Sequence, residues 1–189
     1  MASIQRHAPW PTTLLTERLL LRPIEAADVP AISRTWTDPV VQRYLGGPIG
    51  AAEVARREEK CPGTPNVFSV VRNSDAAVLG TVQFKPVGDT HSELNATGHA
   101  EVGYTFLPEY WGRGYGREAV SAVASWALEN FTPATPAVIA FTQEANKESR
   151  RLLEAIGMTL AGRFEAWGTS QLMYSVDRAA LRSDLASGV

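Results

Sequence analysis

Residues 101–131 contain a strand-like segment, then a glycine-rich turn, then a long helical segment. This order restricts the possible folds more than any other feature of the sequence. Residues 101–107 alternate between two faces with the period of a β-strand, whereas apolar residues over 116–131 recur with the period of an α-helix. A buried strand is predicted next, over 137–142. A strand–helix–strand unit packs its helix on one face of a sheet, so the pattern predicts a mixed α/β or α+β domain.

The other segments predict the rest of this sheet and its helices. Strand patterns, some separated by short turn-forming runs, cover residues 19–24, 67–72, 77–87, 158–164 and 171–176. Helical patterns cover residues 25–36, 51–60 and 146–156, the last with Asn146 as N-cap and Gly157 as C-terminal stop. We therefore expect a single, mostly antiparallel sheet of six to seven strands, flanked by about four helices.

Composition excludes several classes of protein. A chain of 189 residues with 44% apolar residues suits one compact domain, or at most two small ones. A net charge of −2 lacks the basic excess that binding a nucleic-acid backbone requires. No apolar run reaches the roughly 20 residues that span a bilayer, and no apolar leader precedes residue 13, so we expect a cytoplasmic protein. The single Cys61 and three scattered histidines provide no metal-ligand spacing, so we expect no metal.

The turn over residues 111–116 is the most informative segment. Gly112, Gly114 and Gly116 let the backbone approach a ligand closely, and the unpaired amides of the following helix point outward at the positive end of its dipole. Arg113 and Arg117 add positive charge, so the turn is suited to a phosphate or pyrophosphate. Tight turning alone would also explain the glycines. P-loop and dinucleotide-binding patterns do not fit, because no glycine precedes a lysine and Arg117 occupies the position of the third dinucleotide glycine.

This turn resembles motif A of the GCN5-related N-acetyltransferases (GNAT), with Trp111 in place of the usual first residue. Three further segments are similar to the RimJ/RimL type, which acetylates the N-termini of ribosomal proteins: residues 15–23, residues 108–112, and residues 146–149 with the helix end at 156–158. The resemblance spans about residues 14–176. It implies an N-terminal extension over 1–13, an acetyltransferase domain over 14–180 and a C-terminal tail over 181–189.

The resemblance implies a binding site for acetyl-CoA. The CoA pyrophosphate would lie on the amides of the turn, and pantetheine would enter a cleft where strands 101–107 and 137–142 splay apart. Free backbone groups of splayed strands can pair with the amides of pantetheine as if it were an added strand. The residues expected to bind the coenzyme are Phe106, Leu107, Arg113, Gly114, Tyr115, Gly116, Arg117, Asn146 and Ser149.

Acetyl transfer to an amine requires a base for the amine and a proton for the departing thiolate. Glu101, at the start of its strand, is the candidate base; Glu165 is a second candidate, and proximity alone is a third explanation. The tyrosine that often protonates the thiolate in the family would fall at Leu153, so the resemblance assigns this role to Ser149. Its helical position, shared with Leu153, points it toward the sheet and the cleft. The alternative is that Ser149 and Asn146 serve only to cap the helix.

We therefore predict direct transfer of acetyl from acetyl-CoA to a primary amine in a ternary complex. Residues 25–60 would line the acceptor side, and their balanced acidic and basic residues leave the acceptor open. Peptide N-termini, free amino acids, polyamines and amine-bearing antibiotics all fit. Transfer of a larger acyl group such as succinyl, and CoA binding without turnover in a sensor or scaffold, are the alternatives. Family likeness also predicts a possible homodimer.

Overall fold

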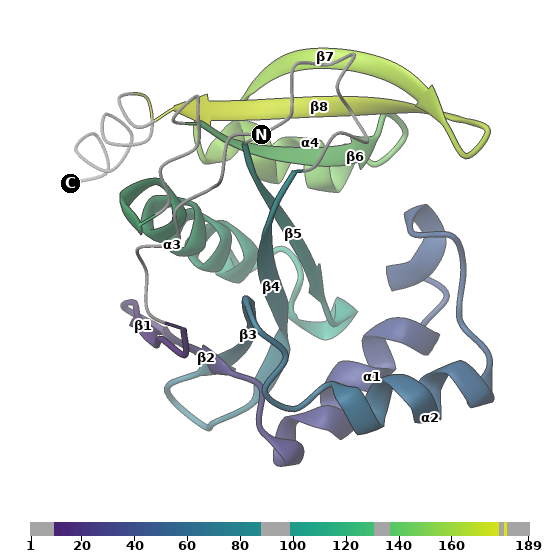
Figure 1. Cartoon of the computed structure of the whole chain (residues 1–189), viewed down its shortest axis with the longest axis vertical. Coiled ribbons are helices and arrows are strands. Elements are labelled where there is room, and N and C mark those ends of the chain that lie inside the picture. Colours follow the sequence, from purple (N-terminus) through teal and green to yellow (C-terminus); the bar gives the residue numbers. More distant parts are fainter. Residues whose placement is uncertain (1–9, 88–98, 131–136, 178–179, 181–189) are drawn as a thin grey trace. The chain divides into compact units, whose positions relative to one another are not determined.

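A computed structural model describes residues 10–87, 99–130, 137–177 and 180 of the chain (Figure 1). Backbone proximity divides the chain into two compact units. Unit 1 comprises residues 1–9, 84–103 and 123–189, and unit 2 comprises residues 10–83 and 104–122. The expected tail over 181–189 and most of the expected extension over 1–13 lie outside the described residues.

Unit 2 contains an antiparallel set of strands and two helices that contact each other (Figure 1). The strands are β1 (Leu14–Leu15), β2 (Leu19–Pro23), β3 (Val67–Arg72) and most of β4 (Val78–Pro86). Between β2 and β3 the chain forms η1 (Ala26–Asp28), α1 (Val29–Thr37), η2 (Val41–Tyr44) and α2 (Ala51–Lys60). The side chains of Leu19, Leu21, Phe68 and Val70 are fully buried, which is why β2 and β3 keep this register.

Unit 1 contains the start of β5 (Ala100–Phe106), together with β6 (Ala137–Gln143), β7 (Thr159–Ala166) and β8 (Thr169–Asp177). The strand β6 pairs antiparallel with β8, which pairs antiparallel with β7. Between β5 and β6 the pairing is parallel, at Ala100 with Val138 and at Glu101 with Ile139. The helix α4 (Lys147–Ala155) lies against β6 (Figure 1), while α3 (Tyr115–Asn130) begins in unit 2 and ends in unit 1.

The predicted mixed α/β fold is confirmed. The described residues form eight strands, hydrogen-bonded in the order β1-β2-β3-β4-β5-β6-β8-β7, and only the β5–β6 neighbours are parallel among the pairs with an assigned direction. The strand beyond the predicted seven is β1, whose two residues pair with Leu20 and Leu21. Two residues are too short to show a period of two, so sequence periodicity missed this strand.

The predicted helices agree with α2, α3 and α4 to within one residue, apart from residue 131, which lies outside the described residues. The segment predicted as one helix over 25–36 instead begins with the 3₁₀ turn η1. Pro30 lies in the first turn of α1, where its missing N–H has no helical acceptor to lose, so the α-helix begins there.

Candidate functional site

The glycine-rich turn lies between the 3₁₀ turn η4 (Pro108–Tyr110) and the start of α3, within unit 2. Gly112 has φ +70° and Gly114 has φ +81°, in the left-handed region that strains residues with a side chain. A Cβ added at Gly112 would meet no atom within 4 Å. The backbone of the turn therefore requires glycine for its conformation and leaves open space over Gly112.

The start of α3 presents unpaired donors next to positive charge. The first bond of the helix runs from the Glu118 N–H to the Gly114 carbonyl oxygen, at 3.1 Å. Because an α-helix bonds each N–H to the carbonyl four residues earlier, the N–H groups of Tyr115, Gly116 and Arg117 have no acceptor within α3. Both Arg113 and Arg117 are exposed and form no ion pair with another described residue. This arrangement favours an anion over the turn.

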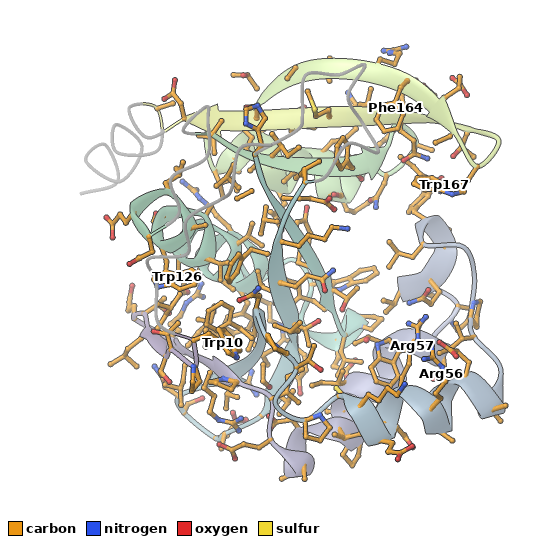
Figure 2. All side chains as sticks on the ribbon, in the orientation of Figure 1. Trp10, Arg56, Arg57, Trp126, Phe164 and Trp167 are labelled. Carbon is orange, nitrogen blue, oxygen red and sulfur yellow. The ribbon has the colours of Figure 1, made fainter. Side chains whose placement is uncertain are left out.

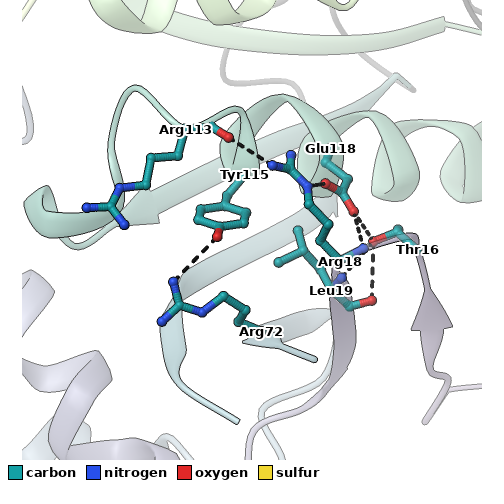
Figure 3. Close-up of polar contacts among 7 residues, drawn as sticks. All are labelled: Thr16, Arg18, Leu19, Arg72, Arg113, Tyr115 and Glu118. Atoms are coloured by element: carbon teal, nitrogen blue, oxygen red, sulfur yellow. Dashed lines mark hydrogen bonds and ion pairs between the residues drawn. The ribbon is translucent and has the colours of Figure 1, made fainter. Parts of the chain in front are cut away.

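Glu118 fixes the start of α3 to the segment that joins β1 and β2 (Figure 3). Its Oε1 accepts hydrogen bonds from Thr16 Oγ1 at 2.6 Å and from the Arg18 N–H at 2.8 Å, and its Oε2 pairs with Arg18 Nε at 2.7 Å. Arg18 Nη1 also donates to the Arg113 carbonyl oxygen at 3.0 Å, so Arg18 bridges the turn and the helix. Sequence analysis missed this pair, because 100 residues separate Arg18 from Glu118 and no local pattern connects them.

The ionisation of Glu118 supports this attachment. Burial raises the pKa of its carboxyl, but the hydrogen bonds from Thr16 and Arg18 and the Arg18 charge outweigh burial and hold the pKa below its usual value. Glu118 is therefore ionised at neutral pH and accepts all of these bonds.

Aromatic residues pack around the same turn. The Trp111 indole N–H donates to the Phe106 carbonyl oxygen at 2.7 Å, although 42% of Trp111 is exposed. The Tyr115 ring lies 4.7 Å from the Arg18 guanidinium, and its hydroxyl accepts from Arg72 Nη1 at 3.4 Å. These contacts hold the turn against β3 and the residue that precedes β2.

The two predicted coenzyme contacts on the strand side have neighbours of their own. The Leu107 N–H donates to the Leu79 carbonyl oxygen at 2.9 Å, and the Leu107 carbonyl oxygen accepts from the Tyr110 N–H at 3.0 Å. The Phe106 carbonyl accepts from the indole of Trp111. A polar contact from either carbonyl to a coenzyme would therefore use its second lone pair.

The candidate base Glu101 lies on β5 in unit 1. Its side chain is 17% exposed, and its Oε2 lies 3.3 Å from Nζ of Lys85 on β4. Glu101 is thus a partly buried carboxylate held by a neighbouring cation, whereas the second candidate, Glu165 on β7, is exposed to solvent.

On α4 the structure confirms that Asn146 caps the helix. Its Oδ1 accepts a hydrogen bond from the Ser149 N–H at 3.1 Å, and Gly157, with φ +81°, follows the helix end. Leu153 and Ile156 are buried, so the face that Ser149 shares with them packs inward, as predicted. Ser149 itself is half-buried at the start of this face.

A buried tyrosine ties α4 to β8, and sequence analysis did not predict it. The Tyr174 hydroxyl donates to Glu154 Oε1 at 2.8 Å and accepts from Arg150 Nε at 3.3 Å. Burial raises the pKa of Tyr174 above its usual value. This network orients the helix that carries Ser149.

Unit 2 also contains a pocket of about 230 Å³ in the region that the sequence assigned to the acceptor. Residues from α1, α2, β3 and β4 and from the segments next to them line it: Ile24, Ile32, Trp36, Arg56, Arg57, Lys60, Cys61, Thr64, Val67, Thr81 and Gln83. Thr81 Oγ1 lies within hydrogen-bond distance, 3.2 Å, of Thr105 Oγ1 on β5. The pocket therefore adjoins the strand that leads into the glycine-rich turn.

The described residues contain no group of three or more His, Cys, Asp or Glu side chains arranged to hold a metal ion. None of the helices among them has the length and apolar character needed to cross a bilayer.

Comparison with known proteins decides the family. Residues 18–159, about three quarters of the chain, match the family model described as the acetyltransferase (GNAT) domain. The chain belongs to the GNAT acetyltransferase family. This GNAT protein is therefore an acyltransferase, as its sequence motifs predicted. The RimJ/RimL subtype stays a prediction.

Curated relatives agree with this assignment, and solved structures share the fold. The GNAT protein is 27% identical over 157 residues to the uncharacterized N-acetyltransferase p20 of Bacillus licheniformis, covering 79% of this chain and 84% of that protein. It is 27% identical over 161 residues to YoaA of Bacillus subtilis, also named an uncharacterized N-acetyltransferase, with 79% and 84% covered. A GNAT acetyltransferase structure from Bacillus anthracis shares the fold, with a TM-score of 0.71, 24% identity and coverage of 87% and 98%. So does an aminoglycoside acetyltransferase solved with coenzyme A, with a TM-score of 0.68, 15% identity and coverage of 87% and 98%.

Proposed function

We propose that this GNAT protein transfers an acetyl group from acetyl-CoA directly to a primary amine on a small molecule or a protein N-terminus, through residues 14–180. The observation that carries the proposal is the glycine-rich turn, which is open over Gly112 and presents the amides at the start of α3 between Arg113 and Arg117. Coenzyme A in the structure of the aminoglycoside acetyltransferase, which shares the fold, supports the choice of donor.

The residues of the turn fit the diphosphate of the coenzyme. N–H groups over residues 113–117 would donate to its oxygens, and the two exposed guanidinium groups would neutralise its charge. Asn146 would offer its side-chain N–H₂, because its Oδ1 accepts the bond that caps α4. The backbone of β5 and β6 would pair with pantetheine beyond the two positions at which these strands pair with each other. Phe106 and Leu107 would contribute at the end of β5.

Acetyl-CoA supplies an activated thioester. The protein must remove a proton from the amine and deliver one to the departing thiolate. We assign Glu101 the removal of the amine proton, with Lys85 holding its carboxylate. We assign Ser149 Oγ the return of a proton to the departing sulfur. An α-amine titrates near pH 8 and a lysine near pH 10, so an α-amine demands less of the base.

Calorimetry with coenzyme A tests the coenzyme site. We expect binding to the wild-type protein and at least about tenfold weaker binding to the Arg113→Gln, Arg117→Gln double variant, because two charge-assisted contacts are lost. Arg163→Gln removes another exposed arginine, from β7, and serves as the control. An absence of binding to the wild-type protein would overturn the proposed coenzyme site.

Thiol release with a panel of amines tests the reaction, using acetyl-CoA and succinyl-CoA on one preparation. We expect steady amine-dependent release from acetyl-CoA. Faster release from succinyl-CoA would replace the donor, and coenzyme binding without any amine-dependent release would identify a sensor or scaffold instead of an enzyme.

A further inference from the structure

We propose that the pocket between α1, α2 and the β3–β4 strands selects acceptor amines that also carry an anionic group, such as a carboxylate, next to an apolar part. This inference rests on the proposed function, because it names the class of acceptor. Small amino acids and the N-termini of peptides with an acidic side chain share this chemistry.

The wall of the pocket is apolar. Ile24, Ile32 and Cys61 form a buried cluster, and Trp36 and Val67 pack against it. All five line the pocket. Its volume of about 230 Å³ is smaller than the roughly 300–1,000 Å³ of pockets that enclose a drug-sized ligand. The pocket therefore suits one side chain or a small amine.

The charged residues that line the pocket are all cations on α2: Arg56, Arg57 and Lys60 (Figure 2 labels the two arginines). Together with Glu53 they occupy helix positions three, four and seven residues apart, which place them on one face of α2. Glu58 and Glu59 fall outside that face, since each residue turns the helix by about 100°. The charged side chains of α2 that line the pocket are thus all cations, although Glu58 lies close enough to Cys61 in the pocket wall for its charge to raise the pKa of that thiol.

Glu53 and Glu58 together offset only part of the charge of the three cations. Its carboxylate bonds to Arg56 at 2.7 Å and to Arg57 at 2.7 Å, and these hydrogen bonds lower the pKa of Glu53 to about 2. Glu53 therefore stays a single negative charge beside two arginines, and Lys60 forms no ion pair with any described residue. The charge of buried Asp28 also raises the pKa of Cys61, but Arg22 offsets this charge by pairing with both carboxylate oxygens, at 2.6 and 2.9 Å.

Arg57 is held in a position to receive the anion. Its guanidinium lies 5.8 Å from the ring centre of Trp36, which is also part of the pocket wall. Because Nε of Arg57 donates to Glu53, the two Nη groups form the planar fork of N–H donors that matches a carboxylate. An acceptor with an apolar part against Trp36 would thus place its carboxylate at Arg57.

Matched pairs of acceptors test the inference. The small-molecule pair is 4-(aminomethyl)benzoate and 4-(aminomethyl)benzamide, and the peptide pair is Leu-Glu-amide and Leu-Gln-amide. Within each pair the amine and the shape are nearly equal and one charge differs. We expect kcat/KM to be about tenfold higher for the anionic member, because it gains a charge-assisted hydrogen bond. This bond is partly exposed, so the difference should shrink as the salt concentration is raised from about 20 to about 500 mM. A preference in one pair only would identify the source of the acceptor.

Two variants on the same helix face should act in opposite directions. Arg57→Gln should abolish most of the preference, whereas Glu53→Gln should enlarge it, because the arginines lose their internal partner. Arg163→Gln again controls for the loss of an exposed arginine. A merely structural role of α2 would not produce opposite changes.

Binding measured without turnover separates this inference from the proposed function. Each pair is also titrated calorimetrically into the enzyme saturated with coenzyme A. The inference would be overturned if the two members of each pair bound with equal affinity, or if the preference were unchanged in Arg57→Gln. In either case, turnover of neutral amines would still support the proposed function. An anion preference in binding without thiol release for any amine would support the pocket assignment and overturn the proposed reaction.

Discussion

Replacing Gly80 by alanine should destabilise the protein through one backbone contact. Gly80 lies on β4, opposite Val70 of β3, with φ +157°. A Cβ built there would lie 2.0 Å from the Thr105 carbonyl oxygen and 2.8 Å from Cα of Phe106. Both contacts are with backbone atoms, so no side-chain rotation relieves them.

The size of the effect follows from this geometry. Ordinary contact begins at 3.4 Å, so the backbone of β4 and β5 would have to separate locally by roughly 1.4 Å. Overpacking of this kind costs about 1–3 kcal/mol, and the strained backbone adds about 1–3 kcal/mol for a residue with a side chain. We expect Gly80→Ala to lower the free energy of unfolding by about 3 kcal/mol or more, which is a large part of the about 5–15 kcal/mol of a typical domain.

Urea denaturation followed by tryptophan fluorescence measures this change. With an m-value of about 2 kcal/mol/M, the midpoint should fall by about 1.5 M. Gly63→Ala is the matched control, because Gly63 has φ +69° and no atom within 4 Å of an added Cβ. The free energy of unfolding of Gly63→Ala should fall by only about 1–2 kcal/mol, the cost of the left-handed backbone conformation for a residue with a side chain. Equal losses in the two variants would refute the reasoning, since the contact with β5 would then contribute nothing.

Three further predictions concern the two proposed catalytic residues and the attachment of α3. Ser149→Ala should lower turnover at least about tenfold and leave the affinity for coenzyme A nearly intact, and unchanged turnover would remove Ser149 from the mechanism. Glu101→Gln should lower kcat/KM about a hundredfold at pH 7 and less at pH 9, where more of the amine is neutral; an equal loss at both values would exclude a role as base. Glu118→Gln tests how the stability depends on pH. Folding lowers the pKa of Glu118, so the ionised carboxylate stabilises the folded protein above the unfolded pKa of about 4.5. This stabilisation is lost as the pH falls through the folded pKa. The unfolding free energy of the wild type should therefore fall more steeply below about pH 4.5 than that of the variant, and parallel pH profiles would contradict this.

Local sequence patterns predicted most elements of the fold, because each depends on neighbours a few residues away. The helix α4 shows this well: Asn146 as a capping residue, apolar residues at helical spacing and Gly157 at the stop define it from its own segment. The glycine-rich turn was likewise recognisable, because left-handed backbone at Gly112 and Gly114 requires glycine wherever the segment lies.

Contacts between distant segments had no such pattern. The attachment of Glu118 to Arg18 and the pairing of Glu101 with Lys85 depend on which strands become neighbours, and side-chain identity alone does not specify that. The region predicted to line the acceptor side shows the difference most clearly. From the sequence, residues 25–60 are balanced in charge; on the folded chain, packing against α1 and the sheet turns Arg56, Arg57 and Lys60 toward one pocket. Residue order determined the family and the glycine-rich turn, whereas only tertiary packing decided which charges of α2 line the pocket, because the orientation of a helix is set by the apolar surfaces it buries.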